Sequence, residues 1–374
     1  MKISSDDDAI LLLTHVTKFT TRDLSGLIDR GISLSEFVNQ PELFCQEDPS
    51  GRLTHFCQAI SEVKETSLIS EIRGKCDKQD VQLLSVLNPN YPHLLREIHE
   101  PPMLLYVKGE LIQEDDLSVA MVGARHASSY GLRMAYRFSY DLAGSGLTIV
   151  SGLARGIDAE AHRGALDARG RTIAVLGSGI DVIYPKENKK LYDQIAEQGA
   201  VVSEFPLGSE PLAYHFPVRN RIIAGLSQGV VVIEAHQKSG SLITASLAVE
   251  SGREVYALPG SVDSIGSRGT NQLIKDGAKM ALSADDILED LSPVLRGNLL
   301  EKSRAENESQ SLEIKLNEDE QLVFDLLQEN DLSFNELIEQ SGFEISKLSA
   351  ILFQLESLGA TEKLSSGAYS MKSI

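Results

Sequence analysis

The feature that most constrains the fold is an alternation, between residues 117 and 284, of short β-branched runs with longer segments of helical period. This alternation is typical of successive strand and helix units that build a parallel sheet. Glycine-containing turns or irregular loops follow the runs. We therefore expect a doubly wound α/β domain, whose ligands bind at the carboxyl ends of the strands. The predicted strands are 118–123, 147–151, 172–176, 200–203, 229–234 and 254–257.

The regions before and after this alternation predict further domains. The chain has 374 residues, and at about 150 residues per domain it should contain two or three. Residues 1–80 have a helical pattern, and residues 81–116, which include Pro92, Pro101 and Pro102, should lead into the sheet in an extended conformation. We assign residues 81–296 to the sheet domain. The predicted core residues of the N-terminal helices are Leu11, Leu12, Leu13, Val16, Leu24 and Leu27.

The C-terminal part predicts a linker and a small helical module. Residues 297–317 are polar and lack an apolar stripe, which favours a flexible linker. Residues 318–374 read as three short helices and a terminal hairpin around 365–367, a pattern typical of a winged helix. The predicted third helix, 345–358, carries apolar residues from Ile345 to Leu358, and its only cation, Lys347, stands against two glutamates. This helix is poorly suited to bind phosphate, so we expect the module to contact protein or to have a structural role.

The distribution of charge matters more than its sum. The formal net charge is −19, which by itself argues against a nucleic-acid partner. Residues 117–284, however, carry 17 basic and 15 acidic side chains, whereas both flanking regions are acidic. Because a phosphate senses charge only within about 10 Å, the central region can still form a basic cleft. The acidic regions could limit non-specific binding to duplex DNA, or could simply be solvated surfaces.

Several classes of protein and site are disfavoured. No apolar run approaches the roughly 18 residues of a membrane span, and the acidic start of the chain does not resemble a secretion signal, so we expect a cytoplasmic protein without membrane contact. Three cysteines without CxxC spacing predict ordinary thiols and no metal site. No Walker A, HExxH or EF-hand pattern occurs. Residues 225–229 match GxSxG but run from a helix into a strand, the reverse of a nucleophile elbow.

The first strand ends in a turn suited to anions. Gly123 lets backbone N–H groups approach an anion at the start of the following helix, and Arg125 adds a guanidinium that can bind phosphate through two hydrogen bonds. The alternative is a tight turn with an ordinary surface arginine.

The second and third strands also end in glycine-rich turns, at 151–158 and 177–181. Neither completes GxGxxG, so a dinucleotide site has little support. Their N–H groups would line one rim of a crevice, with charge from Arg155 and Lys186. For Asp158 we favour a helix cap or an ion pair with Arg155 over catalysis.

The densest constellation is 215–225. Pro217 suits the first turn of a helix, and Arg219 and Arg221 flank Asn220, which together form a multidentate anion receptor. Phe205, Tyr214 and Phe216 could stack on bases. In the alternative reading Phe216 is a core residue and Arg219 pairs with Glu204 or Glu234. Two later helices are predicted to start at 239–245 and 269–274. The hydroxyls and glycines at these starts could bind phosphate or could simply cap the helices.

Six segments in order, spanning about 160 residues, closely resemble the DNA-processing protein A family, also called DprA or Smf. The segments are GAR at 123–125, SGLARGIDAEAH at 151–162, LGSGIDVIYP at 176–185, FPVRNRIIAGLS at 216–227, SGSLITA at 239–245 and GTNQLIKDGA at 269–278. The resemblance implies an α/β fold with an extended Rossmann-like parallel sheet, an N-terminal helical (SAM-like) domain and a C-terminal winged-helix-like domain. It implies a homodimer that binds single-stranded DNA in a basic pocket and loads the RecA recombinase onto incoming DNA in natural transformation, without catalysis and without a cofactor.

The resemblance also implies roles for individual residues. Arg125 and Lys186 would contact phosphates, Ser151, Gly152 and Gly156 would line the pocket, and Arg219, Asn220 and Arg221 would lie at its mouth. Leu273, Ile274 and Lys275 correspond to the region of dimer contacts. Residues 16–21 lack the Pro-Gly-x-Gly turn frequent in the family, so the N-terminal domain should contribute packing rather than DNA affinity. The full predicted DNA-binding set is Arg125, Ser151, Gly152, Arg155, Gly156, Gly177, Gly179, Lys186, Asn188, Phe216, Arg219, Asn220, Arg221, Gly240 and Ser241.

Two other functions remain as alternatives. One is a nucleotide-processing enzyme of the lysine-decarboxylase-like Rossmann group, but its PGGxGTxxE motif needs a glutamate that residues 268–273 lack. The other is a regulatory adaptor that acts through the winged helix.

Overall fold

The computed structural model describes residues 3, 5–45, 52–62, 66–291, 317–329, 332–357, 361–363 and 368–371. The chain divides into two compact units, Met1–Ser292 and Pro293–Ile374. The predicted linker lies outside the described residues except for Asn317, as does the hairpin tip at 365–367.

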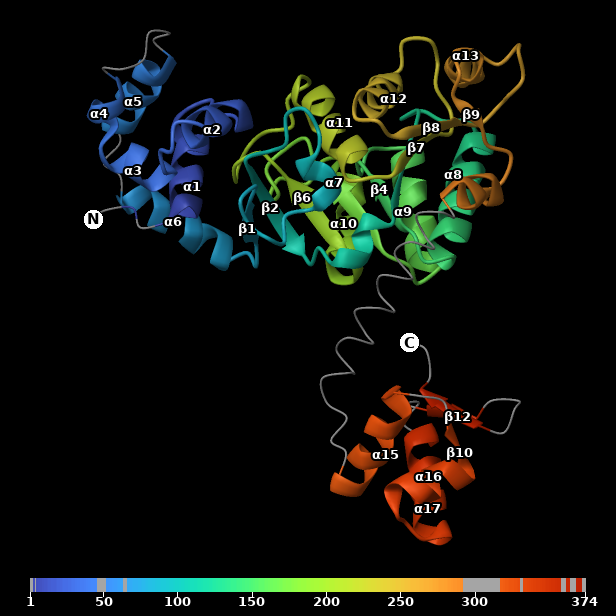
Figure 1. Cartoon of the computed structure of the whole chain (residues 1–374). Helices are drawn as coiled ribbons and strands as arrows, with labels where there is room; N and C mark the ends of the chain where they lie inside the picture. The colour runs from blue at the N-terminus through green and yellow to red at the C-terminus, as the bar shows by residue number, and fades with distance from the viewer. Residues whose placement is uncertain are drawn as a thin grey trace. The chain divides into compact units, whose positions relative to one another are not determined.

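The larger unit is built on a nine-stranded sheet (Figure 1). The strand order is β1-β2-β6-β5-β4-β3-β7-β8-β9, parallel from β6 to β9, with β1 and β2 antiparallel at one edge. All six predicted strands are present, so the doubly wound α/β fold is confirmed. The strands are β1 Gln82–Ser85, β2 Leu104–Gly109, β3 Ser118–Val122, β4 Thr148–Ser151, β5 Thr172–Val175, β6 Ala200–Ser203, β7 Gly229–Val232, β8 Glu254–Ala257 and β9 Lys279–Met280.

Helices cover both faces of this sheet, as Figure 1 shows. On one face α9 packs on β3, β4 and β5, with α8 and α10 at its sides, and on the other face α12 packs on β7 and β8 beside α11. The strand order reverses between β3 and β7, so the loops after these strands diverge and leave a crevice at their carboxyl ends. The helices of this region are α7 His93–Arg96, α8 Ser129–Gly144, α9 Ile157–Asp167, α10 Lys189–Gln198, α11 His215–Gly225, α12 Gly240–Glu250 and α13 Arg268–Lys275, with 3-10 turns η1 Gln113–Asp116, η2 Lys186–Asn188 and η3 Ile265–Ser267.

The N-terminal helices share one apolar core with the sheet. Of the predicted core residues, the five leucines are buried and Val16 is partly buried against them. α1 contacts β1 and β2, and the hydroxyl of Tyr106 lies 2.9 Å from Nε2 of His15. Cys76 is buried and free, whereas Cys57 is disulfide-bonded, so the prediction of ordinary thiols is wrong for Cys57. The helices are α1 Asp6–Val16, α2 Thr21–Ile28, α3 Leu34–Asn39, α4 Pro41–Cys45, α5 Arg52–Glu62 and α6 Thr66–Asp77.

The smaller unit combines three helices with a three-stranded sheet of order β10-β12-β11. Its core is formed by one apolar face of each helix, including Val323, Leu337 and Leu348. Ile345, one of the apolar residues of the predicted third helix, is 66% exposed, because it lies in the first turn of its helix beyond the packed face. The elements are α15 Glu318–Glu329, β10 Leu332–Ser333, α16 Phe334–Ser341, α17 Ile345–Ser357, β11 Thr361–Lys363 and β12 Ala368–Met371.

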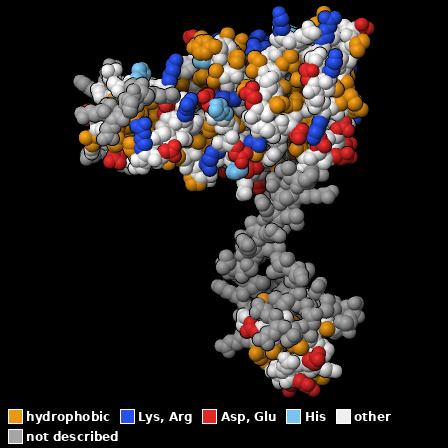
Figure 2. Space-filling model, turned by 45° about the horizontal axis from the view of Figure 1, so that its top comes forward, with side chains coloured by type: hydrophobic (Ala, Val, Ile, Leu, Met, Phe, Trp, Pro, Cys, Tyr) orange, Lys and Arg blue, Asp and Glu red, His pale blue; other side chains and the backbone are white. Residues whose placement is uncertain are grey.

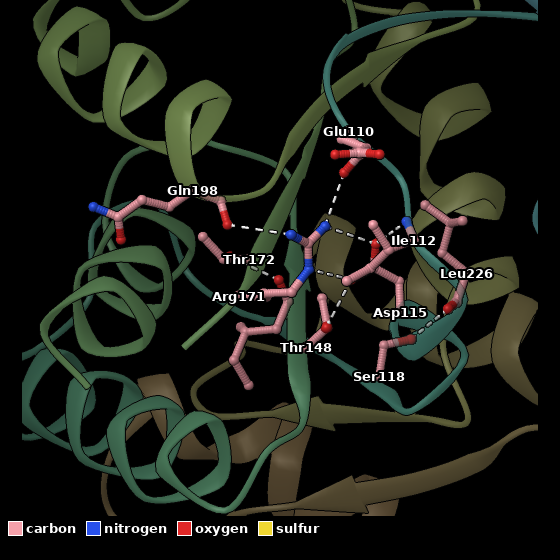
Figure 3. Close-up of polar contacts among 10 residues, drawn as sticks. Glu110, Ile112, Asp115, Ser118, Thr148, Arg171, Thr172, Gln198 and Leu226 are labelled. Atoms are coloured by element: carbon pink, nitrogen blue, oxygen red, sulfur yellow. Dashed lines mark hydrogen bonds and ion pairs between the residues drawn. The ribbon is translucent and has the colours of Figure 1, made fainter. Parts of the chain in front are cut away.

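A polar network around Asp115 and Arg171 holds the amino ends of the central strands together (Figure 3). Arg171 donates from Nε and Nη2 to the two carboxylate oxygens of Asp115, both at 2.9 Å, and from Nη2 to the Glu110 carbonyl at 2.8 Å. Thr148 donates to the same carboxylate at 2.8 Å. This network lies at the edge of the sheet opposite the crevice, so it fixes the sheet without entering the site.

Candidate nucleic-acid interface

A cleft of about 390 Å³ occupies the crevice between the carboxyl ends of β3 and β7. We name it the switch-point cleft. The loop after β3, the first turns of α11 and α12 and the loop after β7 form its walls. Its polar and aromatic lining includes Arg125, His126, Phe216, Asn220, Lys238 and Ser241.

Arg125 and Phe216 form one wall of the cleft. The guanidinium carbon of Arg125 lies 4.9 Å from the ring centroid of Phe216, within the range of a cation–π contact. Gly177 makes room for this ring, since a Cβ at that position would lie 2.8 Å from Cδ1 of Phe216. Arg125 is exposed, and no described carboxylate lies within ion-pair distance of it. Its charge is therefore available to an anionic ligand.

The two predicted cations near the third strand differ in availability. Lys186 is exposed at the start of η2 and has no described carboxylate partner. Arg155 is paired with Glu187, with one hydrogen bond of 3.0 Å from Nη2, and both side chains are about half exposed. Lys186 can meet a phosphate directly, whereas Arg155 would first have to leave Glu187.

The first turn of α12 borders the cleft. Ser239 caps this helix, and its Oγ lies 2.7 Å from Oγ of Ser241. Gly240 is exposed, with open space where a Cβ would stand, and its carbonyl accepts a hydrogen bond of 3.4 Å from Nδ2 of Asn220. The N–H groups of Ser241 and Leu242 donate to Ser239, whereas the helix dipole at this end favours an anion.

Arg219 lies beneath the cleft and not at its mouth, which corrects the prediction. It is 3% exposed and donates from Nη1 to the carbonyls of Gly152, at 2.9 Å, and Val175. Burial lowers the pKa of Arg219 to about 10, although the nearby carboxylate of Asp158 opposes the shift. Arg219 therefore stays protonated at neutral pH and ties the ends of β4 and β5 together.

One reading predicted an ion pair between Asp158 and Arg155, but the two side chains do not pair. Burial raises the pKa of Asp158, and the charge of Arg219 opposes that shift. Its Oδ2 accepts backbone N–H groups of Gly152 at 3.2 Å and Ala154 at 3.4 Å. The carboxylate thus holds the loop between β4 and α9 in place at the floor of the cleft.

Other predicted residues support this loop rather than face the cleft. Ser151 is fully buried and donates to the Met121 carbonyl at 2.6 Å, and Asn188 is 4% exposed and donates to the Leu153 carbonyl at 2.9 Å. Gly156 has a φ of +74° and lies against the Ala124 carbonyl, which leaves no room for a side chain. Gly179 is buried, and its N–H donates to the Ser209 carbonyl at 2.9 Å.

Arg221 lies away from the switch-point cleft. It donates from Nη1 and Nη2 to Glu204 at 2.7 and 2.6 Å. It lines a separate cavity of about 510 Å³ that residues of α1 and the loop after it also line. The structure thus separates Arg219 and Arg221, which the sequence analysis had grouped, and gives the pairing with Glu204 to Arg221.

The cleft lining also includes His126, His236 and Lys238, all three exposed. His126 follows the first predicted strand but was not assigned to the site, and His236 and Lys238 were missed. Lys238 directly precedes the helix cap Ser239, and a cation next to a predicted helix start was the signal available for it. His236 had no such signal. Within the described residues, no group of three or more His, Cys, Asp or Glu side chains could hold a metal ion, and no helix is long and apolar enough to cross a membrane.

The family model for DNA recombination-mediator protein A matches residues 82–292, the whole sheet region that carries the cleft. This chain belongs to that family. A second family model, the DprA winged helix domain, matches residues 307–364. The family member therefore carries the sheet domain and the winged helix that the resemblance implied, and both are confirmed.

Relatives and solved structures agree with this assignment. The family member is 41% identical to DNA processing protein DprA of Bacillus subtilis over 65% of its own chain and 87% of the relative. It is 47% identical to Protein Smf of Synechocystis over 58% of its own chain, but spans only 56% of that relative. The X-ray structure of DprA from Streptococcus pneumoniae superposes with a TM-score of 0.66 at 37% identity, covering 77% of this chain and 98% of that one.

A structure of DNA processing protein A from Helicobacter pylori, described for its single-stranded DNA binding mode, superposes with a TM-score of 0.52 at 31% identity. The similarity covers 57% of this chain and 96% of that one.

Proposed function

We propose that this protein is a cytoplasmic, non-catalytic mediator that binds single-stranded DNA in the switch-point cleft and loads RecA onto incoming DNA in natural transformation. The observation that carries the proposal is the Arg125 and Phe216 pair, which presents an unpaired cation and an aromatic ring on one wall of the cleft. A cation and a ring together suit the phosphate and the base of one nucleotide. The single-strand binding described for the Helicobacter pylori relative supports the same ligand.

The charge distribution on the larger unit favours a ligand held by few, local charges. Figure 2 shows Lys and Arg side chains scattered among acidic and apolar ones on the visible face of the larger unit, without one continuous basic surface. A duplex is bound mainly through many phosphate contacts, whereas a flexible single strand can follow a narrow cleft and stack its bases. We therefore expect single strands to be preferred, with little dependence on base sequence.

The test is fluorescence anisotropy of a labelled strand of about 30 nucleotides, single- and double-stranded, across a salt series. Arg125→Ala with Lys186→Ala should weaken single-strand binding strongly and lower the salt slope by about 0.7 per lost phosphate contact. The control is Lys78→Ala with Arg169→Ala, which removes two exposed cations elsewhere on the larger unit and should change little. A wild-type protein that binds neither form, or a cleft variant that binds as well as wild type, would overturn the proposal.

We further propose that the protein forms a homodimer through the surface around α13. Leu273 and Ile274 are half-buried and Lys275 is exposed. Ile265 and Met280, on neighbouring segments, are 66% and 50% exposed, an apolar excess that suits an interface. Light scattering should report a dimer for wild type and a monomer for Ile274→Asp. A monomeric wild type would overturn this part while leaving the DNA cleft untouched.

A further inference from the structure

The outward face of α8 carries two tyrosines and two arginines. With 3.6 residues per turn, positions 130, 133, 137 and 140 fall on one stripe of the helix. Tyr130 is 47% and Tyr140 44% exposed, and Arg133 and Arg137 are also exposed. We name these four residues the α8 stripe.

The opposite face of α8 accounts for its packing, so the stripe is not needed for the fold. Ala135, Phe138 and Leu142 are buried between α8 and the rest of the unit, and α8 packs closely along α9. Figure 1 shows α8 at the outside of the larger unit beside α9. Large rings that remain exposed on such a surface helix are candidates for contact with a ligand.

The two arginines of the α8 stripe lack strong ion-pair partners among the described residues. Arg133 has no described carboxylate within ion-pair distance, and Arg137 is 72% exposed, with Asp141 at 3.7 Å as a weak partner. The rings of Tyr136 and Tyr140 are stacked, with centroids 6.2 Å apart at 18°. Tyr136 is fixed by a 2.9 Å hydrogen bond from its hydroxyl to Asp167. This hydrogen bond occupies Asp167 and fixes the ring of Tyr136, on which the exposed ring of Tyr140 stacks.

The stripe begins beside the switch-point cleft. α8 starts at Ser129, four residues after Arg125. The preceding residue, Ser128, is fixed by its backbone N–H to the carboxylate of Glu234 at 3.1 Å. From Tyr130 to Tyr140 the helix advances about 15 Å. That length corresponds to about four nucleotides of a stacked single strand at about 3.4 Å each.

We propose that the α8 stripe is a second contact site for single-stranded DNA, which holds the segment of strand that leaves the switch-point cleft past Arg125. Tyr130 and Tyr140 stack on bases, and Arg133 and Arg137 contact the phosphates between them. This inference rests on the proposed function, because it requires a strand in the cleft. Tyrosine and arginine are also frequent in protein interfaces, but continuity with the cleft favours nucleic acid.

The experiment compares two oligo(dT) lengths on the full chain, about 6 nucleotides to fill the cleft and about 12 to reach the stripe. Arg133→Ala with Arg137→Ala keeps good helix formers on α8. This variant should bind the longer strand about tenfold more weakly, with a salt slope lower by about 1.4 for two lost phosphate contacts, and should bind the shorter strand like wild type. Tyr130→Ala with Tyr140→Ala should weaken the longer strand at an unchanged salt slope. The charge-matched control is again Lys78→Ala with Arg169→Ala.

The outcomes separate this inference from the proposed function. If wild type gains no affinity from the longer strand, or if the arginine variant binds both lengths like wild type, the α8 stripe is not a DNA contact and the cleft proposal stands. Equal weakening of binding to both strand lengths would also overturn this role of the α8 stripe, since the loss of its arginines would then act on the cleft itself. If wild type binds neither strand, the proposed function fails first.

Discussion

The guanidinium of Arg125, which follows β3, lies 4.9 Å above the ring of Phe216 in the first turn of α11. Arg125 lies in the loop after β3 and Phe216 in a helix about 90 residues later, and only the crevice between β3 and β7 brings them together. Through this contact the ring limits where the guanidinium can lie before any ligand arrives. The ring itself is held against Gly177, whose missing side chain leaves the space.

Phe216→Leu should weaken single-strand binding about tenfold, because base stacking and the cation–π contact are both lost. The salt slope should stay unchanged, since no phosphate contact is removed. Anisotropy across a salt series measures both quantities. The matched control is Phe205→Leu, whose ring stacks on His215 at 4.0 Å outside the cleft lining. Equal losses for the two variants would argue against a direct role of Phe216.

Gly152→Ala should destabilise the protein by about 1–3 kcal/mol. The added Cβ would lie 2.5 Å from Nη2 of Arg219, and that guanidinium cannot move freely because two strand-end carbonyls hold it. Urea unfolding followed by circular dichroism measures the free energy of unfolding. Gly240→Ala is the control, since its Cβ would meet nothing within 4 Å. A Gly152 variant as stable as wild type would show that Arg219 is not held in place.

His162 should make the protein less stable as the pH falls. Burial, helped by the charges of Arg219 and Arg163, lowers the pKa of His162 to about 3. An unfolded chain protonates this histidine below its usual pKa of about 6.5, while the folded protein keeps it neutral. The stabilising contribution is therefore complete above about pH 6.5 and is lost towards pH 3, at about 1.4 kcal/mol per pH unit.

The measurement for His162 is urea unfolding at several pH values between about 7 and 4 for wild type and His162→Gln. Carboxylates contribute to both proteins, so the difference between the two curves isolates the histidine. Parallel curves would contradict the prediction.

Asp115→Asn should lower the free energy of unfolding by about 2–3 kcal/mol, because Arg171 loses its two-point partner while 28% exposed. Thermal or urea unfolding measures this loss. Single-strand affinity of the folded variant should remain that of wild type, since the network lies at the opposite edge of the sheet from the cleft. Glu187→Gln, which breaks the half-exposed pair with Arg155, should cost less than about 1 kcal/mol. A larger loss for Glu187→Gln would reverse the expected ranking.

Truncation after Ser292 should leave single-strand affinity within about twofold of the full chain, because we expect the winged-helix unit to contact protein rather than phosphate. Within its described residues, the only cation on α17 is Lys347, which pairs with Asp319 at 2.8 Å. Anisotropy on the truncated chain tests this expectation. A marked loss of affinity would assign the winged helix a direct part in DNA binding.

The local sequence was sufficient to predict the six strands β3 to β8 and the position of the cleft, but not the short exposed strand β9. Each of the six is a short, largely β-branched run, and its burial in the sheet favours that composition. The loop after β3 and the start of α12 could also be placed, because glycines and capping serines mark these turns. The segments that form β1 and β2 were predicted only as an extended stretch leading into the sheet, since antiparallel edge strands depend on pairing partners distant in the sequence.

The tertiary structure decided which side chains of the candidate site face the ligand. Arg219 and Arg221 are two positions apart in the FPVRNR motif, and side chains with that spacing on a helix differ by about 200° in direction. Packing of α11 therefore turns Arg219 beneath the cleft and Arg221 towards Glu204. Likewise, Ser151 and Asn188 donate hydrogen bonds to backbone carbonyls that only the folded loops bring near. Local sequence determines strands, turns and residue types, whereas the direction of a side chain depends on long-range packing.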